Sequence, residues 1–405
     1  MLAAIAEGRS RISNFATSAD CASTLACIEA LGVRIEQEGN SVTVEGVGKT
    51  GLKKPAGPLD CGNSGTTMRL ISGILAGQPF ESTLTGDESL SRRPMRRIMG
   101  PLTKMGAAIS AVDGHAPLTI TGMNPLKPLN FELPVASAQL KSCVLLAGLN
   151  AEGETTVIER TETRDHTERM LQGFGVEVRV EHGDEGKRIS VSGDATLTAI
   201  DVEVPRDVSS AAFFLVAASC MPGSRIEIPG VGLNPTRTGI IEVLRRFGAS
   251  IEIIQERVSG GESIGTLIVS GDNRLGAEVN RIEGGIVANL IDEVPILAVF
   301  GTQVEGGIEI RDAGELRVKE SDRIAAVAEN LRRMGAEVEE FQDGLRIERS
   351  QLKGAAIDSF DDHRIAMAFA VAGLFAEGET EIRGAECAAV SFPGFFDVLS
   401  SVTNG

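Results

Sequence analysis

The sequence predicts a two-domain α/β fold built from six repeats. Three observations lead to this prediction. A chain of 405 residues exceeds what one compact hydrophobic core accommodates. An apolar helix, a glycine-containing turn and a short alternating strand recur six times along the chain. The turn glycines lie 69 to 83 residues apart and are Gly8, Gly77, Gly153, Gly223, Gly306 and Gly378.

A second signature follows in five of the six repeats, a helix that ends on glycine and leads into a β-hairpin. Glycine after the last helical residue supplies the left-handed cap of such a helix. The five cap glycines are Gly32, Gly106, Gly175, Gly248 and Gly335. Each repeat is therefore expected to follow the order βαβαββ.

Six repeats divide into two lobes of three, with the crossing expected at Pro205-Arg206. The first lobe then spans 1–205 and the second 206–405. Repeats two to six each have a polar segment just before the apolar helix. Repeat one has none, because the sequence begins inside that helix, so we expect repeat one to be truncated.

Composition excludes several classes of function. The net charge of −17 argues against nucleic acid and acidic membrane surfaces as partners. The six cysteines are scattered without a CxxC pair, which indicates reduced thiols in a cytoplasmic protein and no zinc site. No apolar run reaches transmembrane length, and the first residues lack the basic flank of a signal peptide.

The polar segments before the helices carry the candidate chemistry. In 60–69, an extended segment turns into an apolar helix through Gly62 and Gly65. Small residues there leave backbone N–H groups accessible to an anion, and Arg69 adds a charge one turn later. An ordinary N-cap by Asn63 or Ser64 explains the pattern equally well.

Basic residues gather at other predicted helix starts. Segment 92–97 carries four arginines in six positions, which in so acidic a chain suggests phosphate or carboxylate binding rather than a solvated face. Segment 137–142 combines hydroxyl, amide and ammonium groups. Arg164 precedes another helix, where it could cap the helix or bind a ligand.

Acidic and mixed clusters lie in the second half. Asp292 and Glu293 stand between apolar residues, which suits a general base, although an N-cap aspartate is an equal alternative. On a helix, Lys319 and Arg323 would share one face with Glu320 adjacent, so an anion or carboxylate is expected between them. Arg364 at a helix start opposes the helix dipole, which also favours a bound anion.

Taken together, the motifs resemble the 5-enolpyruvylshikimate-3-phosphate synthase family of enolpyruvyl transferases. The resemblance covers essentially the whole chain in order. The motifs that carry it are 62–69, 91–95, 136–139, 164–168, 317–323, 362–364 and 391–393.

The resemblance implies a two-domain inside-out α/β barrel of six βαβαββ repeats. It also implies transfer of the enolpyruvyl group of phosphoenolpyruvate to the 5-hydroxyl of shikimate 3-phosphate, with release of phosphate, in chorismate biosynthesis. No metal or cofactor is expected. The expected enzyme is a cytoplasmic monomer whose partners are these two small anions.

The family's residue roles carry over position by position. Asp292 is expected to take the 5-hydroxyl proton and Glu320 to handle the proton at the methylene carbon. Phosphoenolpyruvate is expected to bind Gly65, Arg93, Gln139, Arg323 and Arg364. Shikimate 3-phosphate is expected to bind Ser137, Ala138, Gln139, Arg164, Asp292 and Lys319. Because Gly65 is small, the phosphoenolpyruvate pocket should admit glyphosate.

The chain departs from the family pattern at several points. The family has a Lys-Ser pair, and an arginine four residues beyond the serine, ahead of the segment that begins here at Met1. Because these residues contact substrate, we expect low activity or none from the chain as given. Val390 and Glu315 replace a lysine and an asparagine found in some members.

Three alternative functions differ in the sequence features that they require. The sister transferase acting on UDP-N-acetylglucosamine usually carries a reactive cysteine in the loop at 89–93, and no cysteine lies between Cys61 and Cys143. A non-catalytic ligand-binding remnant of the fold is compatible with the missing segment. An RNA-processing relative built from similar repeats is disfavoured by the charge and by the lack of Tyr and Trp.

Overall fold

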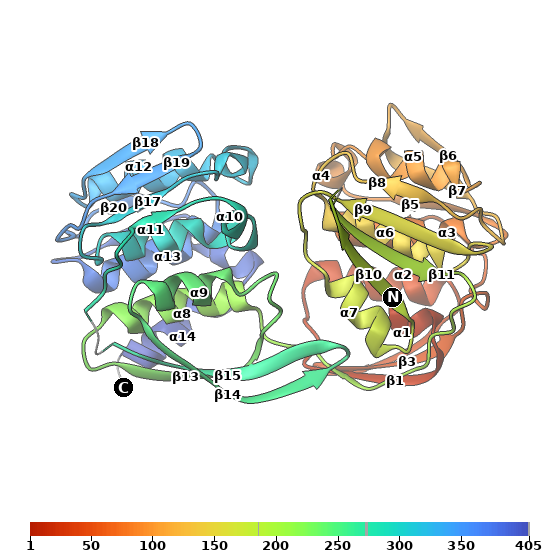
Figure 1. Cartoon of the computed structure of the whole chain (residues 1–405), viewed down its shortest axis with the longest axis horizontal. Coiled ribbons are helices and arrows are strands. Elements are labelled where there is room, and N and C mark those ends of the chain that lie inside the picture. The colour runs from red at the N-terminus through yellow and green to blue at the C-terminus, as the bar shows by residue number, and fades with distance from the viewer. Residues whose placement is uncertain (185, 272–273, 404–405) are drawn as a thin grey trace. The chain divides into compact units, whose positions relative to one another are not determined.

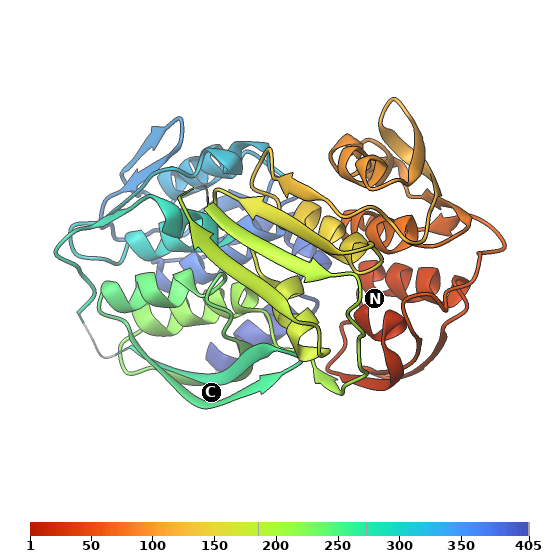
Figure 2. The same cartoon turned by 45° about the vertical axis from the view of Figure 1, so that its right-hand side comes forward.

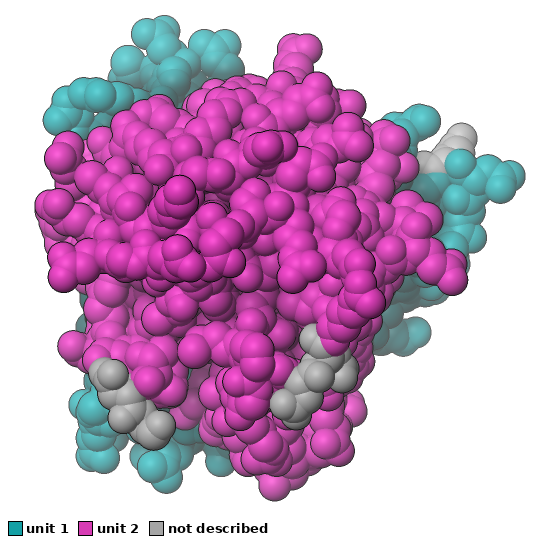
Figure 3. Space-filling view, turned by 90° about the vertical axis from the view of Figure 1, so that its left-hand side faces the viewer, with its two compact units in different colours: residues 1–204, 258–262 teal, residues 205–257, 263–405 magenta. Residues whose placement is uncertain are grey.

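The computed structural model describes residues 1–184, 186–271 and 274–403 and divides the chain into two compact units (Figure 3). Unit 1 contains Met1–Val204 and Val258–Glu262, and unit 2 contains Pro205–Arg257 and Ser263–Gly405. Each unit has its own hydrophobic core. The division falls after Val204, and 258–262, which the repeat pattern placed in the second lobe, belongs to unit 1.

Unit 1 contains three four-stranded sheets of one pattern, in which the first two strands are parallel and the remaining neighbours are antiparallel. The yellow to yellow-green sheet β8–β9–β11–β10 faces the viewer in Figure 2. In spatial order, the first sheet contains β12 (Val202–Glu203), β1 (Glu7–Ser13), β3 (Ser41–Val47) and β2 (Arg34–Glu38). The second contains β4 (Leu59–Asp60), β5 (Glu81–Thr85), β7 (His115–Thr121) and β6 (Ala108–Val112). The third contains β8 (Asn130–Glu132), β9 (Glu154–Glu159), β11 (Gly186–Ser192) and β10 (Val178–Gly183).

The first sheet takes its edge strand from a distant part of the chain. In the other two sheets of unit 1, the leading strand of the repeat itself lies parallel at the edge. Here β12, from the end of the third repeat, takes that place and pairs parallel with β1 through Ile12 and Val202. The edge strand of the first sheet thus comes from the end of the third repeat.

Helices of two kinds pack on the sheets of unit 1. α3 (Gly65–Ala76) and α6 (Ala138–Gly148) are buried along most of their length and lie against each other. Because so much of their surface is buried, these two helices form the interior of unit 1. The other helices are α1 (Leu2–Ile5), α2 (Ala19–Ala30), α4 (Glu88–Ser91), α5 (Arg96–Lys104) and α7 (His166–Gly173).

Unit 2 has a similar architecture, but its first sheet has three strands and its last has two (Figure 1). Its sheets are β13 (Arg225–Gly232), β15 (Glu262–Ser270) and β14 (Ser250–Ser259); β16 (Arg281–Ile282), β17 (Ile308–Ile310), β19 (Gly344–Ile347) and β18 (Val338–Phe341); β20 (Ala356–Asp358) and β21 (Glu381–Arg383). After β21 the chain forms η3 (Ala385–Val390) and α14 (Phe395–Thr403) rather than a hairpin.

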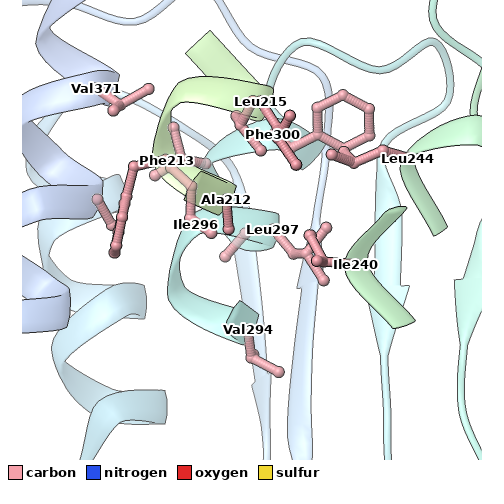
Figure 4. Close-up of a cluster of buried hydrophobic side chains, with 14 of the residues drawn as sticks. Ala212, Phe213, Leu215, Ile240, Leu244, Val294, Ile296, Leu297, Phe300 and Val371 are labelled. Atoms are coloured by element: carbon pink, nitrogen blue, oxygen red, sulfur yellow. The ribbon is translucent and has the colours of Figure 1, made fainter. Parts of the chain in front are cut away.

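Three apolar helices pack together inside unit 2: α8 (Val208–Cys220), α11 (Val294–Gly301) and α13 (His363–Phe375). Figure 4 shows their side chains in contact, with Phe213 of α8 and Leu297 of α11 among them. The remaining helical elements are α9 (Gly239–Arg246), α10 (Gly285–Asn289), η1 (Ile291–Glu293), η2 (Gly314–Val318) and α12 (Arg323–Arg333). Within 1–184, 186–271 and 274–403, no helix is both long and apolar enough to span a membrane.

Candidate active site

The N-terminus of α3 in unit 1 is both capped and basic. Ser64 Oγ accepts a hydrogen bond from Thr67 N at 3.2 Å, so the ordinary cap is present. Gly65 is the first helical residue. A Cβ placed on it would lie 2.7 Å from Arg69 Nη1 and 3.4 Å from Arg93 Nη1. The absence of a side chain at position 65 therefore lets two guanidinium groups approach the helix start.

A relay of side chains orients Arg93. Its Nη2 donates to Asn63 Oδ1 at 2.7 Å, and Asn63 Nδ2 donates to Asp87 Oδ2 at 2.7 Å. Burial, and then the nearby charges of Arg93 and Arg97, lower the pKa of Arg69. Three like charges around one helix start favour a bound anion, because an anion would relieve their repulsion.

Side chains at the N-terminus of α6 contact side chains at the N-terminus of α3. Ser137 caps α6 by accepting from Leu140 N at 3.3 Å, and Ala138 is the first helical residue. Gln139 Nε2 donates to Thr66 Oγ1 at 2.9 Å, while Gln139 Oε1 accepts from Arg69 Nη1 at 2.7 Å.

A pocket of about 200 Å³ opens beside these groups, with Arg69, Arg97, Ser137 and Gln139 among its lining residues. The sequence placed Arg69 and Arg97 in segments expected to bind an anion, but the resemblance assigned neither of them to phosphoenolpyruvate or shikimate 3-phosphate. The four-residue spacing of Arg69 from Gly65, which puts both on one helix face, was the available signal.

Arg164 lies just before α7, with an exposed side chain. The N-cap position of α7 is Asp165, whose side chain makes no capping bond and instead pairs with Arg169 Nε at 2.8 Å. The capping role considered for Arg164 is therefore wrong, and ligand binding remains as a prediction.

A buried arginine organises the candidate site of unit 2. The Arg323 side chain is 1% exposed, and its Nε donates to Asp362 Oδ2 at 2.8 Å. Its Nη2 donates to Glu320 Oε2 at 2.7 Å, and its Nη1 donates to Asp292 Oδ1 at 3.3 Å. One guanidinium thus holds both carboxylates that the resemblance assigned to proton transfer.

The expected helix carrying Lys319 and Arg323 on one face is wrong. η2 ends at Val318, Lys319 is extended, and α12 begins only at Arg323. Asp322 caps α12 by accepting from Ala325 N at 3.0 Å, so an N-cap aspartate interrupts the run. Lys319 Nζ pairs with Glu315 Oε1 at 2.6 Å. Lys319 is accordingly tied to Glu315 rather than stacked beside Arg323.

Arg364 lies in the first turn of α13 and faces the segment before α11. Its Nη1 donates to the Asp292 carbonyl at 3.2 Å and lies 3.9 Å from Glu293 Oε1. Asp292 belongs to the 3-10 turn η1, so the alternative of an N-cap aspartate fails at this position.

Electrostatics differ sharply among the carboxyls of this cluster. Burial raises the pKa of Asp362, but the bonds from Arg323, Arg364 N and Ser321 outweigh burial and lower it. Burial raises the pKa of Glu293, against the opposing charge of Arg364. Asp362 is therefore a fixed anion that anchors Arg323, an anchoring role that sequence analysis did not assign to it.

The expected residues thus form two groups. Gly65, Arg93, Ser137, Ala138 and Gln139 surround two helix N-termini in unit 1. Asp292, Glu320, Arg323 and Arg364 are linked in unit 2. Cationic groups beside carboxylates, which can take or give a proton, suit group transfer between anionic molecules. The described residues contain no group of three or more His, Cys, Asp or Glu that could hold a metal ion.

Comparison with known proteins gives a consistent result. Residues 1–399 match the family model described as EPSP synthase (3-phosphoshikimate 1-carboxyvinyltransferase). The 3-phosphoshikimate 1-carboxyvinyltransferase of Koribacter versatilis is 55% identical over 404 residues, which cover 99% of this chain and 92% of that protein. The protein of the same description from Salinibacter ruber is 52% identical over 408 residues, covering 100% and 93%.

Solved structures agree with these relatives. A structure of EPSP synthase from Acinetobacter baumannii superimposes with a TM-score of 0.93 at 44% identity, covering 99% of this chain and 92% of that one. This similarity confirms the expected fold class. Because the matches extend over nearly the whole chain, they give no support to the expectation of low activity or of a non-catalytic remnant.

Proposed function

Because the chain belongs to the EPSP synthase family, we propose that it transfers the enolpyruvyl group of phosphoenolpyruvate to the 5-hydroxyl of shikimate 3-phosphate and releases phosphate. The observation that carries this proposal beyond the family is the Arg323 cluster. There a buried cation contacts Asp292 and Glu320, the two carboxylates that such a reaction needs.

The two carboxylates have separate tasks in the proposed reaction. Asp292 takes the proton from the 5-hydroxyl as the oxygen attacks C2 of phosphoenolpyruvate. Glu320, which is half-exposed, delivers a proton to the methylene carbon C3, giving a tetrahedral ketal. The ketal then loses phosphate as Glu320 takes a proton back from C3, which restores the double bond. Arg323 stabilises each carboxylate while it is ionised, Asp292 before it takes the hydroxyl proton and Glu320 after it has given its proton to C3.

Anion binding is the proposed task of the other residues. Arg93 and Gly65 would hold phosphoenolpyruvate at the start of α3, with Gln139, Arg323 and Arg364 as further ligands. The contact of Arg69 with Gln139 supports this role, because it places a cation beside Gln139 near the helix start where Arg93 also lies.

The proposed ligands of shikimate 3-phosphate are Ser137, Ala138, Gln139, Arg164, Asp292 and Lys319. Ser137 and Ala138 open α6, where backbone N–H groups and the helix dipole favour a phosphate or carboxylate. Lys319 is paired with Glu315, so its role in binding requires that the ammonium exchange this carboxylate for the substrate.

Phosphate release from the two substrates tests the proposal. We expect turnover only when both are present, with enolpyruvyl shikimate 3-phosphate as the product by mass spectrometry. Asp292→Asn should lower kcat by about 10²- to 10⁴-fold, because the general base is lost. Asp343→Asn, at a carboxylate paired with Arg311 in the same unit, serves as the control and should leave kcat unchanged. Turnover with UDP-N-acetylglucosamine in place of shikimate 3-phosphate would contradict the assignment.

The cellular location and the oligomeric state of the chain are also proposed. We propose a cytoplasmic enzyme, supported by six free cysteines. We also propose a monomer, which light scattering of the purified chain would test directly.

A further inference from the structure

A buried cluster of one lysine and two glutamates lies behind the start of α6 in unit 1. Lys141 is 0% exposed, and its Nζ lies 3.1 Å from Glu159 Oε2 and 2.7 Å from Glu168 Oε1. Both glutamate side chains are also buried. The reaction proposed above uses none of these three residues.

One end of the cluster belongs to the first turns of α6. Lys141 N bonds to Ser137 O at 3.1 Å, so the lysine lies one turn after the residue that caps the helix. The other end reaches the loop that carries Arg164. Glu159 Oε2 accepts from Thr163 N at 3.3 Å and from Thr163 Oγ1 at 2.7 Å. A continuous chain of polar contacts therefore joins Ser137 to the residue before Arg164.

Stability alone is a weak reason for such a cluster. Taking an ammonium and two carboxylates out of water costs several kcal/mol per ion, and apolar residues of similar size often serve a core equally well. The cluster also keeps two carboxylates near each other. Burial raises the pKa of Glu168. Lys141 opposes this shift in part, and the charge of Glu159 adds to it. A geometric role accounts for such an arrangement better than a stabilising one.

We propose that Lys141, through Glu159 and Thr163, holds the Arg164 loop at a fixed distance from the start of α6. Lys141, Glu159 and Thr163 are positioning residues for shikimate 3-phosphate. This inference rests on the proposed function, in which Arg164 and Ser137 bind that substrate. The phosphoenolpyruvate ligands Arg93 and Gly65 have other supports, and Gln139 is held by Thr66 and Arg69. The cluster should therefore affect one substrate and not the other.

A change at Thr163 tests the link without disturbing the buried charges. Thr163→Val keeps the side-chain shape and removes the hydroxyl that donates to Glu159. We expect the KM for shikimate 3-phosphate to rise about tenfold, as for loss of a hydrogen bond to a charged group. The KM for phosphoenolpyruvate and kcat should stay within about twofold of the wild type. The matched control is Thr156→Val, which removes a buried hydroxyl contact to Ser190 in the same unit.

A second pair of variants separates position from charge. Lys141→Met leaves Glu159 and Glu168 facing each other and should weaken binding of shikimate 3-phosphate by about tenfold or more. Glu168→Gln keeps the contacts from Lys141 through Glu159 to Thr163 and should bind normally. Lys49→Met removes a lysine that donates to the carbonyls of Leu149 and Gly193 in the same unit, so it should lower thermal stability without changing this affinity.

Calorimetry of shikimate 3-phosphate binding to the whole chain distinguishes the outcomes. If the wild type binds and both Thr163→Val and Lys141→Met bind equally well, the positioning role is refuted while the proposed function stands. Equal weakening by Glu168→Gln and Lys141→Met would also refute it, because buried charge rather than the link would then matter. If the wild type itself does not bind shikimate 3-phosphate, the proposed function fails first.

Discussion

Replacing Arg323 by methionine should lower the free energy of unfolding of unit 2 strongly, because it removes the cation that pairs with a buried carboxylate. The guanidinium is 1% exposed and makes two hydrogen bonds to Asp362, at 2.8 and 3.3 Å, and Asp362 itself is 0% exposed. Arg323→Met keeps most of the apolar stem but leaves this carboxylate buried without its cation. Removing one partner of a buried pair costs about 3–5 kcal/mol. The half-exposed Glu320 adds little to that sum, because water screens it.

Thermal unfolding of the whole chain measures this change. With about 2–4 °C of Tm lost per kcal/mol in a domain of this size, the transition of unit 2 should fall by about 6–20 °C. The control is Arg346→Met, whose guanidinium is half-exposed and lies 3.3 Å from Glu348, and its Tm should move by no more than about 2 °C. A Tm for Arg323→Met equal to that of the control would refute the reasoning.

The pH dependence supplies a sharper check. In the wild type the pKa of Asp362 is lowered, so its contribution to stability is present at neutral pH and is lost as pH falls through the lowered pKa. Without Arg323, burial remains and should raise the pKa of Asp362, so the variant suffers most at neutral pH. The Tm difference between wild type and Arg323→Met should therefore shrink as pH falls from 7 toward 4. A difference that stays constant over this range would show that Asp362 is not the affected group.

Three further predictions follow from other contacts. Gly65→Ala places a Cβ 2.7 Å from Arg69 Nη1, so the guanidinium must shift away from Gln139. The KM for phosphoenolpyruvate should therefore rise about tenfold in steady-state assays. An unchanged KM would show that this helix start does not bind phosphoenolpyruvate. Glu293→Gln removes a carboxyl whose pKa is raised by burial, so the variant should be more stable than the wild type at pH 7, by an amount that vanishes below about pH 4 in thermal scans; a lower Tm at pH 7 would count against this. Glyphosate at millimolar concentration should inhibit the wild type in competition with phosphoenolpyruvate, and inhibition insensitive to phosphoenolpyruvate would place it elsewhere.

Much of the fold could be predicted because local chemistry repeats. Glycines such as Gly32 and Gly106 have φ values of +88° and +112° after α2 and α5, as helix-ending caps require. The apolar composition of helices such as α8 and α11 is enough to predict that they are buried. The strand β12 could not be predicted in the first sheet, because pairing between Ile12 and Val202 depends on contacts about half the chain apart.

Site residues could be predicted where they lie within one segment of the chain, but not where residues from several segments come together. Ser64 and Ser137 were visible as helix starts because capping acts within four residues. The partner of Lys319 was missed, since the spacing of charges was taken for one continuous helix that Asp322 in fact interrupts. The buried contact between Lys141 and Glu159 was equally hidden, because opposite charges on different elements leave no pattern along the chain.

The sequence by itself determined where helices such as α3 and α6 begin, which helices must be interior, and that small polar and cationic groups stand at those beginnings. These properties depend on neighbours within a few residues, so the order of amino acids is sufficient to specify them. Only the tertiary structure decided that Asp362 and Asp292 meet at Arg323, and that Lys141 reaches the loop before Arg164. Those contacts depend on how separate elements pack, and packing is fixed by the whole core rather than by any one segment.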